Sequence, residues 1–213
     1  MKYNPEKHHR RALRLPGYDY SQAGVYFITI GAWQKECLFG IIANGQMAMN
    51  QRGQAVQEEW IRTAAIRGEI ELDVFQAMPN HFHAVVFIVG AHGDAPRNVE
   101  ADSRPPVYAK ADRAHSCVPL QRAPRSLGSL VAGFKSAVTR RINESRGAAG
   151  QPVWQRNYYE HVIRNEDSLN RIREYIINNP LRWHLDKQNP HRTGEDDFDL
   201  WIAGHPPGSI HSL

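Results

Sequence analysis

The segment from residue 70 to residue 89 places the strongest constraint on the fold. Apolar and acidic residues alternate from Ile70 to Val74, a pattern typical of a half-buried strand. The triplet Met78-Pro79-Asn80 then turns the chain into a second strand over residues 81–89. Alternate side chains of this second strand are apolar and share one face: Phe82, Ala84, Val86 and Ile88. We therefore predict two sequential strands with an apolar face that packs on helices.

The remaining elements are predicted from propensity, periodicity and capping residues. Residues 25–30 and 37–43 are expected to be strands, and Asn44-Gly45 is a hairpin turn signal before a strand over 46–49. Helices are expected over 51–66 after Asn50, from Ser126 through Ile142, and from Asn165 to Pro180, with a short extended piece over 153–163 between the last two. This order favours an α+β domain, an antiparallel sheet with helices on one side.

A chain of 213 residues fits one domain with room for loops. We assign residues 1–185 to this domain. Residues 90–124 hold five of the thirteen prolines and no apolar period, which predicts a long mobile loop. The residues after Pro180 carry Pro, Gly, His and acids and predict a loosely structured end, with 186–213 as a C-terminal extension.

Composition bears on location and partners. No apolar run is long enough to cross a membrane and the basic start has no apolar stretch after it, so a cytoplasmic protein is expected. The two cysteines fit neither a metal spacing nor a disulfide framework. The net charge of +4 is compatible with nucleic acid, and basic residues gather near the start, but a solvated surface explains the charge equally well.

His81 and His83 form a candidate metal site. On a strand both side chains lie on the same face, so the two imidazoles can converge on one cation. A chance H-x-H triplet on the surface is the alternative. Two histidines also suggest zinc, but no cysteine, glutamate or third histidine at a standard spacing completes a zinc set. A further ligand must therefore come from elsewhere in the chain.

The helix over 165–180 offers that ligand and a nucleophile. Tyr175 and Asn179 lie one turn apart at the border of its apolar face, with Arg171 one turn before Tyr175. The amide oxygen of Asn179 suits a hard cation such as Mg²⁺ or Mn²⁺. A cation beside the phenol would assist attack on a phosphate, although a helical tyrosine beside isoleucines is more often part of a core. Tyr158 and Tyr159 are rival nucleophiles, for which we favour core packing.

Six segments, in this order, resemble the REP-associated tyrosine transposases, relatives of the single-tyrosine HUH transposases of bacterial insertion sequences. They are Arg14-Leu-Pro-Gly-Tyr-Asp-Tyr-Ser21, Tyr26-Phe-Ile-Thr-Ile30, Met78-Pro-Asn-His-Phe-His83, Phe134-Lys-Ser136, Trp154-Gln155 through Tyr159, and Tyr175-Ile-Ile-Asn-Asn-Pro180.

The resemblance implies a ferredoxin-like or RRM-like palm with both histidines on a central strand. It implies that His81, His83 and Asn179 bind Mg²⁺ or Mn²⁺, and that Tyr175 is the nucleophile of a DNA nicking and joining enzyme working through a 5′-phosphotyrosine. The implied substrate is single-stranded or hairpin DNA of repeated palindromes, and a monomer is favoured. The segment 90–124 and the extension have no counterpart in the pattern.

Two other functions are compatible with the same residues: a DNA-binding regulator that has lost catalysis, and a zinc hydrolase that uses water. Candidate DNA-binding residues are basic: Arg10, Arg11, Lys135, Arg140 and Arg171. Lys135, Arg140 and Arg146 do not share one stripe of their helix, so the sequence predicts no groove.

Overall fold

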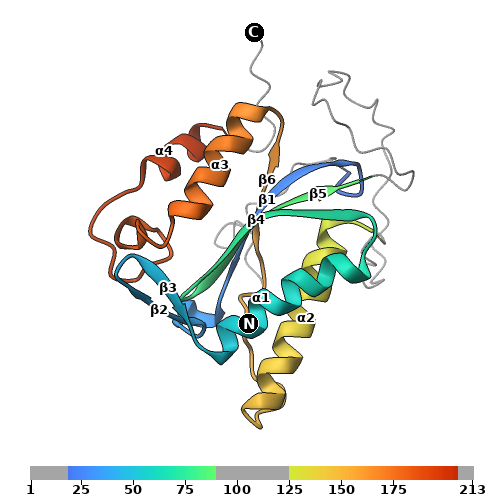
Figure 1. The fold of residues 1–213 in the computed structure, drawn as a ribbon, viewed down its shortest axis with the longest axis vertical. Helices are drawn as coiled ribbons and strands as arrows, with labels where there is room; N and C mark the ends of the chain where they lie inside the picture. The colour runs from blue at the N-terminus through green and yellow to red at the C-terminus, as the bar shows by residue number, and fades with distance from the viewer. Residues whose placement is uncertain (1–18, 90–124, 206–213) are drawn as a thin grey trace, which may run out of the picture.

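The computed structural model describes residues 19–89 and 125–205, and its centre is a four-stranded antiparallel sheet (Figure 1). The strands lie in the order β4-β5-β1-β6, so β5 and β1 are central. Their bounds are β1 Gly24–Gly31, β4 Ile70–Met78, β5 His81–Ile88 and β6 Tyr159–Ile163. A separate hairpin pairs β2 (Gly40–Ala43) with β3 (Gln46–Met49).

The chain order matches a ferredoxin-like unit into which this hairpin is inserted. Without β2 and β3, the order is strand, helix, two strands, helix, strand, with α1 (Gln51–Ile66) and α2 (Leu127–Ser145) as the helices. The α+β class and the antiparallel sheet are therefore confirmed. The hairpin turn is also confirmed, since Asn44 and Gly45 both have positive φ angles, 52° and 73°.

Capping residues fix where the helices begin, and two of them, Asn50 and Asn165, were predicted. The Oδ1 of Asn50 accepts from the backbone nitrogens of Arg52 and Gly53 at the start of α1. Ser126 caps α2, and Asn165 caps α3 (Glu166–Asn178) by accepting from the Ser168 nitrogen. These bonds satisfy amide donors that the first turn of a helix leaves unpaired.

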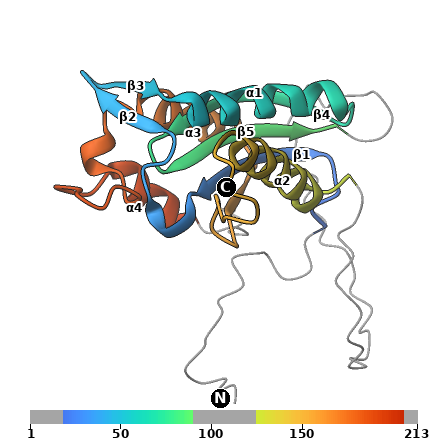
Figure 2. The same ribbon diagram turned by 90° about the horizontal axis from the view of Figure 1, so that it is seen from below.

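The helices cover both faces of the sheet, so the prediction of helices on one side is wrong (Figures 1 and 2). On one face, α1 and α2 bury residues such as Tyr26, Phe82 and Phe134. On the other, α3 and α4 (Asp197–Gly204) bury residues such as Phe27 and Val85. The physical reason is that β1 and β5 are apolar on both faces, and both faces must be shielded from water.

The chain after Pro180 is ordered to His205, where a loose end was predicted. A short turn, η2, spans Trp183–Leu185, and α4 begins after Asp196, whose Oδ1 accepts from the Phe198 nitrogen. Phe198 and Ile202 are buried in the core on the α3 face. No helix in the described part of the chain is long and apolar enough to cross a membrane. The predicted loop 90–124, Arg10 and Arg11 lie outside the described residues.

Candidate metal centre

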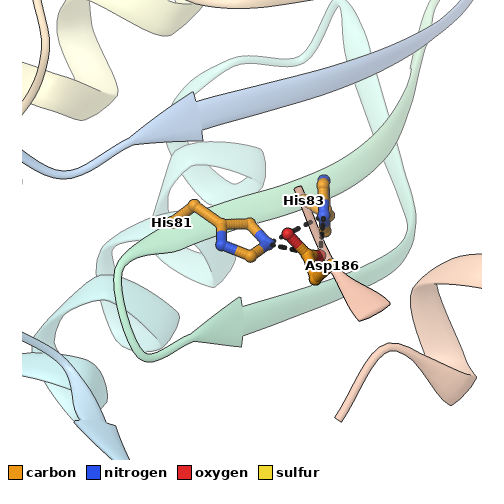
Figure 3. A group of neighbouring side chains, drawn as sticks. All are labelled: His81, His83 and Asp186. Atoms are coloured by element: carbon orange, nitrogen blue, oxygen red, sulfur yellow. Dashed lines mark hydrogen bonds and ion pairs between the residues drawn. The ribbon is translucent and has the colours of Figure 1, made fainter. Parts of the chain in front are cut away.

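His81 and His83 lie on the central strand β5 and point to the face that α3 covers (Figure 3). Their cross-strand partners on β1 are Gly31 and Thr29. The Nε2 atoms of the two imidazoles are 2.8 Å apart, and both side chains are buried. The sequence predicted that two histidines one strand step apart share a face, and the structure brings their rings together at one point.

Asp186 completes the group. Its Oδ2 lies 3.6 Å from the Nε2 of His81 and 4.0 Å from the Nε2 of His83, and the carboxylate is fully buried. The ligand atoms of these three residues all lie within 4.8 Å of one another, so the group could hold a metal ion. Figure 3 shows the carboxylate reaching toward both imidazoles. Two imidazoles and a carboxylate are a donor set that divalent metals accept.

The hydrogen bonds behind the imidazoles leave their Nε2 atoms directed at the centre of the group. Asn80 donates from Nδ2 to the backbone oxygens of Lys35 and Gln188, at 3.1 and 2.8 Å, which fixes its Oδ1 as the atom facing His81. The Nδ1 of His81 lies 2.9 Å from that oxygen and donates to it. The Nε2 of neutral His81 therefore carries the lone pair that a metal ion needs. On His83, Nδ1 contacts the Thr29 hydroxyl at 2.8 Å.

Electrostatics keep the group in its metal-binding protonation states. Burial, and then the neighbouring His83, lower the pKa of His81 to about 3, and burial also lowers the pKa of His83. Burial acts to raise the pKa of Asp186, but the adjacent His81 and His83 and the amide of Asn179 hold it below its usual range. At neutral pH the group therefore consists of two neutral imidazoles and one carboxylate, the forms in which these side chains bind metals.

Tyr175 lies beside this group. Its hydroxyl oxygen is 3.4 Å from the Nε2 of His83 and 3.4 Å from the Oδ2 of Asp186. The side chain is only 5% exposed, and the Phe198 ring stacks on it with centroids 3.7 Å apart. Burial, and then Asp186 and other carboxylates, raise the pKa of Tyr175 well above its usual value. The phenol is therefore protonated in the ion-free protein.

Asn179 is also in the cluster, but in a different contact from the predicted one. Its Nδ2 donates to the Oδ2 of Asp186 at 2.8 Å, and its Oδ1 is buried without a partner among the described residues. Asn179 thus orients the Asp186 carboxylate through its amide nitrogen. Of the rival tyrosines, Tyr158 packs against the core on the α2 face and Tyr159 against the core on the α3 face.

Three of the predicted DNA-binding residues, Arg171, Lys135 and Arg140, lie in the described part of the chain. The Arg171 guanidinium lies 4.8 Å from the centre of the Trp201 ring. Lys135 and Arg140 are on α2, which covers the opposite face of the sheet.

No sequence pattern singles out Asp186, Asn80 or Thr29 as functional residues. Asp186 comes one residue after the predicted domain boundary and follows no periodic pattern. Asn80 and Thr29 stand in recognised motifs, but their roles depend on contacts with distant residues.

The chain is similar both to solved structures and to a protein of known sequence. No protein-family model matches the chain. Among solved structures, the fold is similar to one described as "Structure of the REP associates tyrosine transposase bound to a REP hairpin", with a TM-score of 0.48, 16% identity and 92% of each chain covered. A putative transposase from Deinococcus radiodurans gives a TM-score of 0.39 and 15% identity, covering 76% of this chain and 93% of that one.

A Haemophilus influenzae protein named only "Uncharacterized protein" is 39% identical to the chain over 186 residues. The match covers 87% of this chain and 96% of that protein. Identity at this level over nearly a whole protein shows common descent, and the chain belongs to the same family as this Haemophilus influenzae protein.

Proposed function

We propose that this protein is a metal-dependent enzyme that nicks and rejoins single-stranded DNA through a covalent bond to Tyr175. One observation carries the proposal: the Tyr175 hydroxyl lies 3.4 Å from both His83 and Asp186, members of a buried group that could hold a metal ion. Any buried phenol needs a hydrogen-bond partner, but here both partners belong to the group that could hold the ion, which puts the hydroxyl next to the metal position. The motif resemblance of residues 14–180 supports the same assignment.

In this proposal His81, His83 and Asp186 are the metal ligands. The carboxylate suits Mg²⁺ or Mn²⁺, which prefer oxygen ligands, and the imidazoles suit Mn²⁺. Asn179 holds the carboxylate in place, and its unpartnered Oδ1 remains available as a further ligand. A bound divalent ion would supply positive charge that polarises the scissile phosphate and favours ionisation of a nearby hydroxyl.

In this proposal the protein positions the phenol of Tyr175, which gives up its proton during the reaction. The Tyr175 oxygen attacks the phosphorus, the bond from phosphorus to the 3′ oxygen breaks, and the phenolic proton is passed on to the departing 3′ hydroxyl. The 5′ phosphate stays on Tyr175 as a diester, so the reverse reaction rejoins a strand without another energy source. Because Tyr175 is 5% exposed under Phe198, the chain that covers it must move when DNA binds.

The donor set itself favours a second candidate, a hydrolase that activates water. Two histidines and one carboxylate are also the protein ligands of hydrolytic zinc enzymes. In that enzyme His81, His83 and Asp186 would hold zinc, whose charge would activate water for attack, and the burial of Tyr175 would be purely structural. The two candidates differ in one product, since hydrolysis by water leaves no protein–DNA bond.

A denaturing gel separates the candidates. The protein is incubated with labelled single-stranded and hairpin oligonucleotides, including palindromic repeats, with Mg²⁺, Mn²⁺, Zn²⁺ or EDTA. We expect a covalent protein–DNA band with Mg²⁺ or Mn²⁺ and none with EDTA. Tyr175→Phe should abolish the band, and Tyr159→Phe should retain it.

Loss of the band in Tyr159→Phe alone would move the nucleophile to Tyr159. Cleavage without any band would establish the water mechanism. Binding with neither cleavage nor a band would establish a DNA-binding protein without catalysis.

A further inference from the structure

On the face of the sheet opposite the metal centre, α2 and the segment 150–156 form the two walls of an open groove of about 490 Å³. One wall is the α2 face that carries Lys135, Ser136, Thr139 and Arg140. The other wall is the segment from Gly150 to Arg156. Lys135 and Arg140 do not share a stripe of the helix, but with the segment 150–156 as the second wall both side chains line the same groove.

The groove is positively charged. Three cationic side chains line it and no acidic side chain of the described residues does. Arg140 and Arg156 are exposed, and neither makes an ion pair within the described parts of the chain. Ser136 and Thr139 add hydroxyl donors between the cations. Exposed guanidinium groups and hydroxyls are the usual partners of backbone phosphates.

The groove has fixed walls. The Nζ of Lys135 donates to the backbone oxygens of Gln155 and Arg156, at 2.5 and 3.2 Å, and so ties the segment to α2. The Nδ2 of Asn143, a little more than two helical turns after Lys135 on α2, donates to the Gln151 oxygen at 3.0 Å. The backbones that carry Arg140 and Arg156 are therefore held relative to each other before any ligand binds, which lowers the entropic cost of binding.

The groove begins at the end of the sheet where the metal centre lies. The Gln155 nitrogen donates to the Gly31 oxygen at 2.9 Å, and Gly31 is the cross-strand neighbour of His81. Two strand spacings, about 10 Å, thus separate the backbones of Gln155 and His81. A nucleic-acid strand can cover such a distance within a few nucleotides.

From these observations we propose that the groove binds the phosphodiester backbone of the DNA substrate, a few nucleotides from the reacting phosphate. This inference rests on the proposed function for the identity of the strand, and it adds the surface that holds the strand. Arg140 and Arg156 bind the phosphates, and Lys135 positions the segment that carries Arg156.

The test is DNA binding at several salt concentrations by Arg140→Ala/Arg156→Ala. Fluorescence anisotropy is measured in EDTA, so that a metal ion does not contribute, with a labelled mixed-sequence single strand and with a blunt hairpin that has no single-stranded flank. Each phosphate contact to a single strand contributes about 0.7 to the slope of log affinity against log salt. The double variant should therefore lose about 1.4 from the slope and bind roughly 25-fold more weakly at 0.1 M salt.

Arg62→Ala is the matched control, since Arg62 is an exposed cation on α1, outside the groove. A loss confined to the single strand identifies a flank as the occupant, and a loss confined to the hairpin identifies the stem. The proposal is overturned if the double variant keeps the affinity and slope of Arg62→Ala with both probes, or if the parent protein binds neither probe.

Failure of the enzyme proposal gives a different result. If the parent protein binds DNA with the expected salt slope but forms no covalent band, the groove proposal stands and the assignment of Tyr175 as nucleophile fails. If the covalent band forms but Arg140→Ala/Arg156→Ala binds DNA normally, the nucleophile assignment stands and the groove proposal fails.

Discussion

Replacing Asp186 with asparagine separates metal binding from folding. In the ion-free protein, Oδ1 of Asp186 accepts from the Gln188 nitrogen at 2.6 Å and Oδ2 accepts from Asn179 at 2.8 Å. An asparagine has nearly the same side-chain volume, and its Oδ1 can still accept from the Gln188 nitrogen. Its amide nitrogen replaces Oδ2, and Asn179 can turn its amide to offer the unpartnered Oδ1 as acceptor. These two bonds are retained, and only the long 3.4 Å hydrogen bond from the Tyr175 hydroxyl to Oδ2 is lost, so the free energy of unfolding should change by no more than about 1 kcal/mol.

Metal affinity should fall much further. The Oδ2 of Asp186 faces the Nε2 atoms of His81 and His83 at 3.6 and 4.0 Å, so the substitution puts an NH₂ group, which cannot bind a cation, at the ligand position. It also removes the only negative charge of the three-residue group. Loss of a residue that merely orients a ligand costs 10- to 100-fold in metal affinity. Loss of a charged ligand should cost at least about 100-fold, or about 2.7 kcal/mol.

Isothermal titration with Mn²⁺ measures the affinity, and denaturant unfolding with EDTA measures the stability. Asp167→Asn is the matched control because Asp167 is an exposed carboxylate in the first turn of α3. The reasoning is refuted if Asp186→Asn binds Mn²⁺ within threefold of the control. If Asn179→Ala loses Mn²⁺ instead, the third ligand is the asparagine that the sequence predicts.

Three further substitutions test other contacts. Asn80→Ala leaves Nδ1 of His81 without its acceptor and should weaken Mn²⁺ binding about 10- to 100-fold by titration; unchanged affinity would exclude the bond that orients this ring. Phe198→Ala removes a buried ring that stacks on Tyr175 and should lower the free energy of unfolding by about 3–5 kcal/mol, whereas a loss below about 1 kcal/mol would show that α4 does not pack there in solution. Burial, and then Arg164 and His205, lower the pKa of His161 to about 4, so the unfolded chain takes up this proton first, and the stability present above pH 6.5 is lost as the pH falls toward 4. In His161→Gln this loss, up to about 3 kcal/mol, should be absent from the acid limb of denaturant unfolding, and an unchanged limb would contradict the assignment.

Local signals account for the parts of the structure that the sequence predicted. Asn50, Ser126 and Asn165 begin helices through bonds to residues two or three positions later, and such bonds need no distant partner. His81 and His83 share a face because strand geometry requires it.

The second helical layer also has a local signal in the sequence, on the other face of β1. Val25 and Phe27 are apolar on the face opposite Tyr26 and Ile28, which is typical of a strand buried on both sides.

Asp186 could not be predicted in the same way. Its position depends on how the chain turns after Pro180 and returns to β5, where Asn80 of the β4–β5 turn donates to the Gln188 oxygen. A contact between residues more than a hundred positions apart leaves no trace in local periodicity.

The position of Asp186 has a consequence for the dynamics of the C-terminal segment. A metal ion held by His81, His83 and Asp186 would join the sheet to a segment 103 residues further along the chain, much as a disulfide does. If the ion binds only while Asp186 contacts the two histidines, it stabilises that conformation by an amount that grows with the logarithm of the ion concentration. Hydrogen exchange in residues 181–205 would then slow as Mn²⁺ is added. The frequency with which Tyr175 becomes accessible would thereby depend on the free metal concentration around the protein.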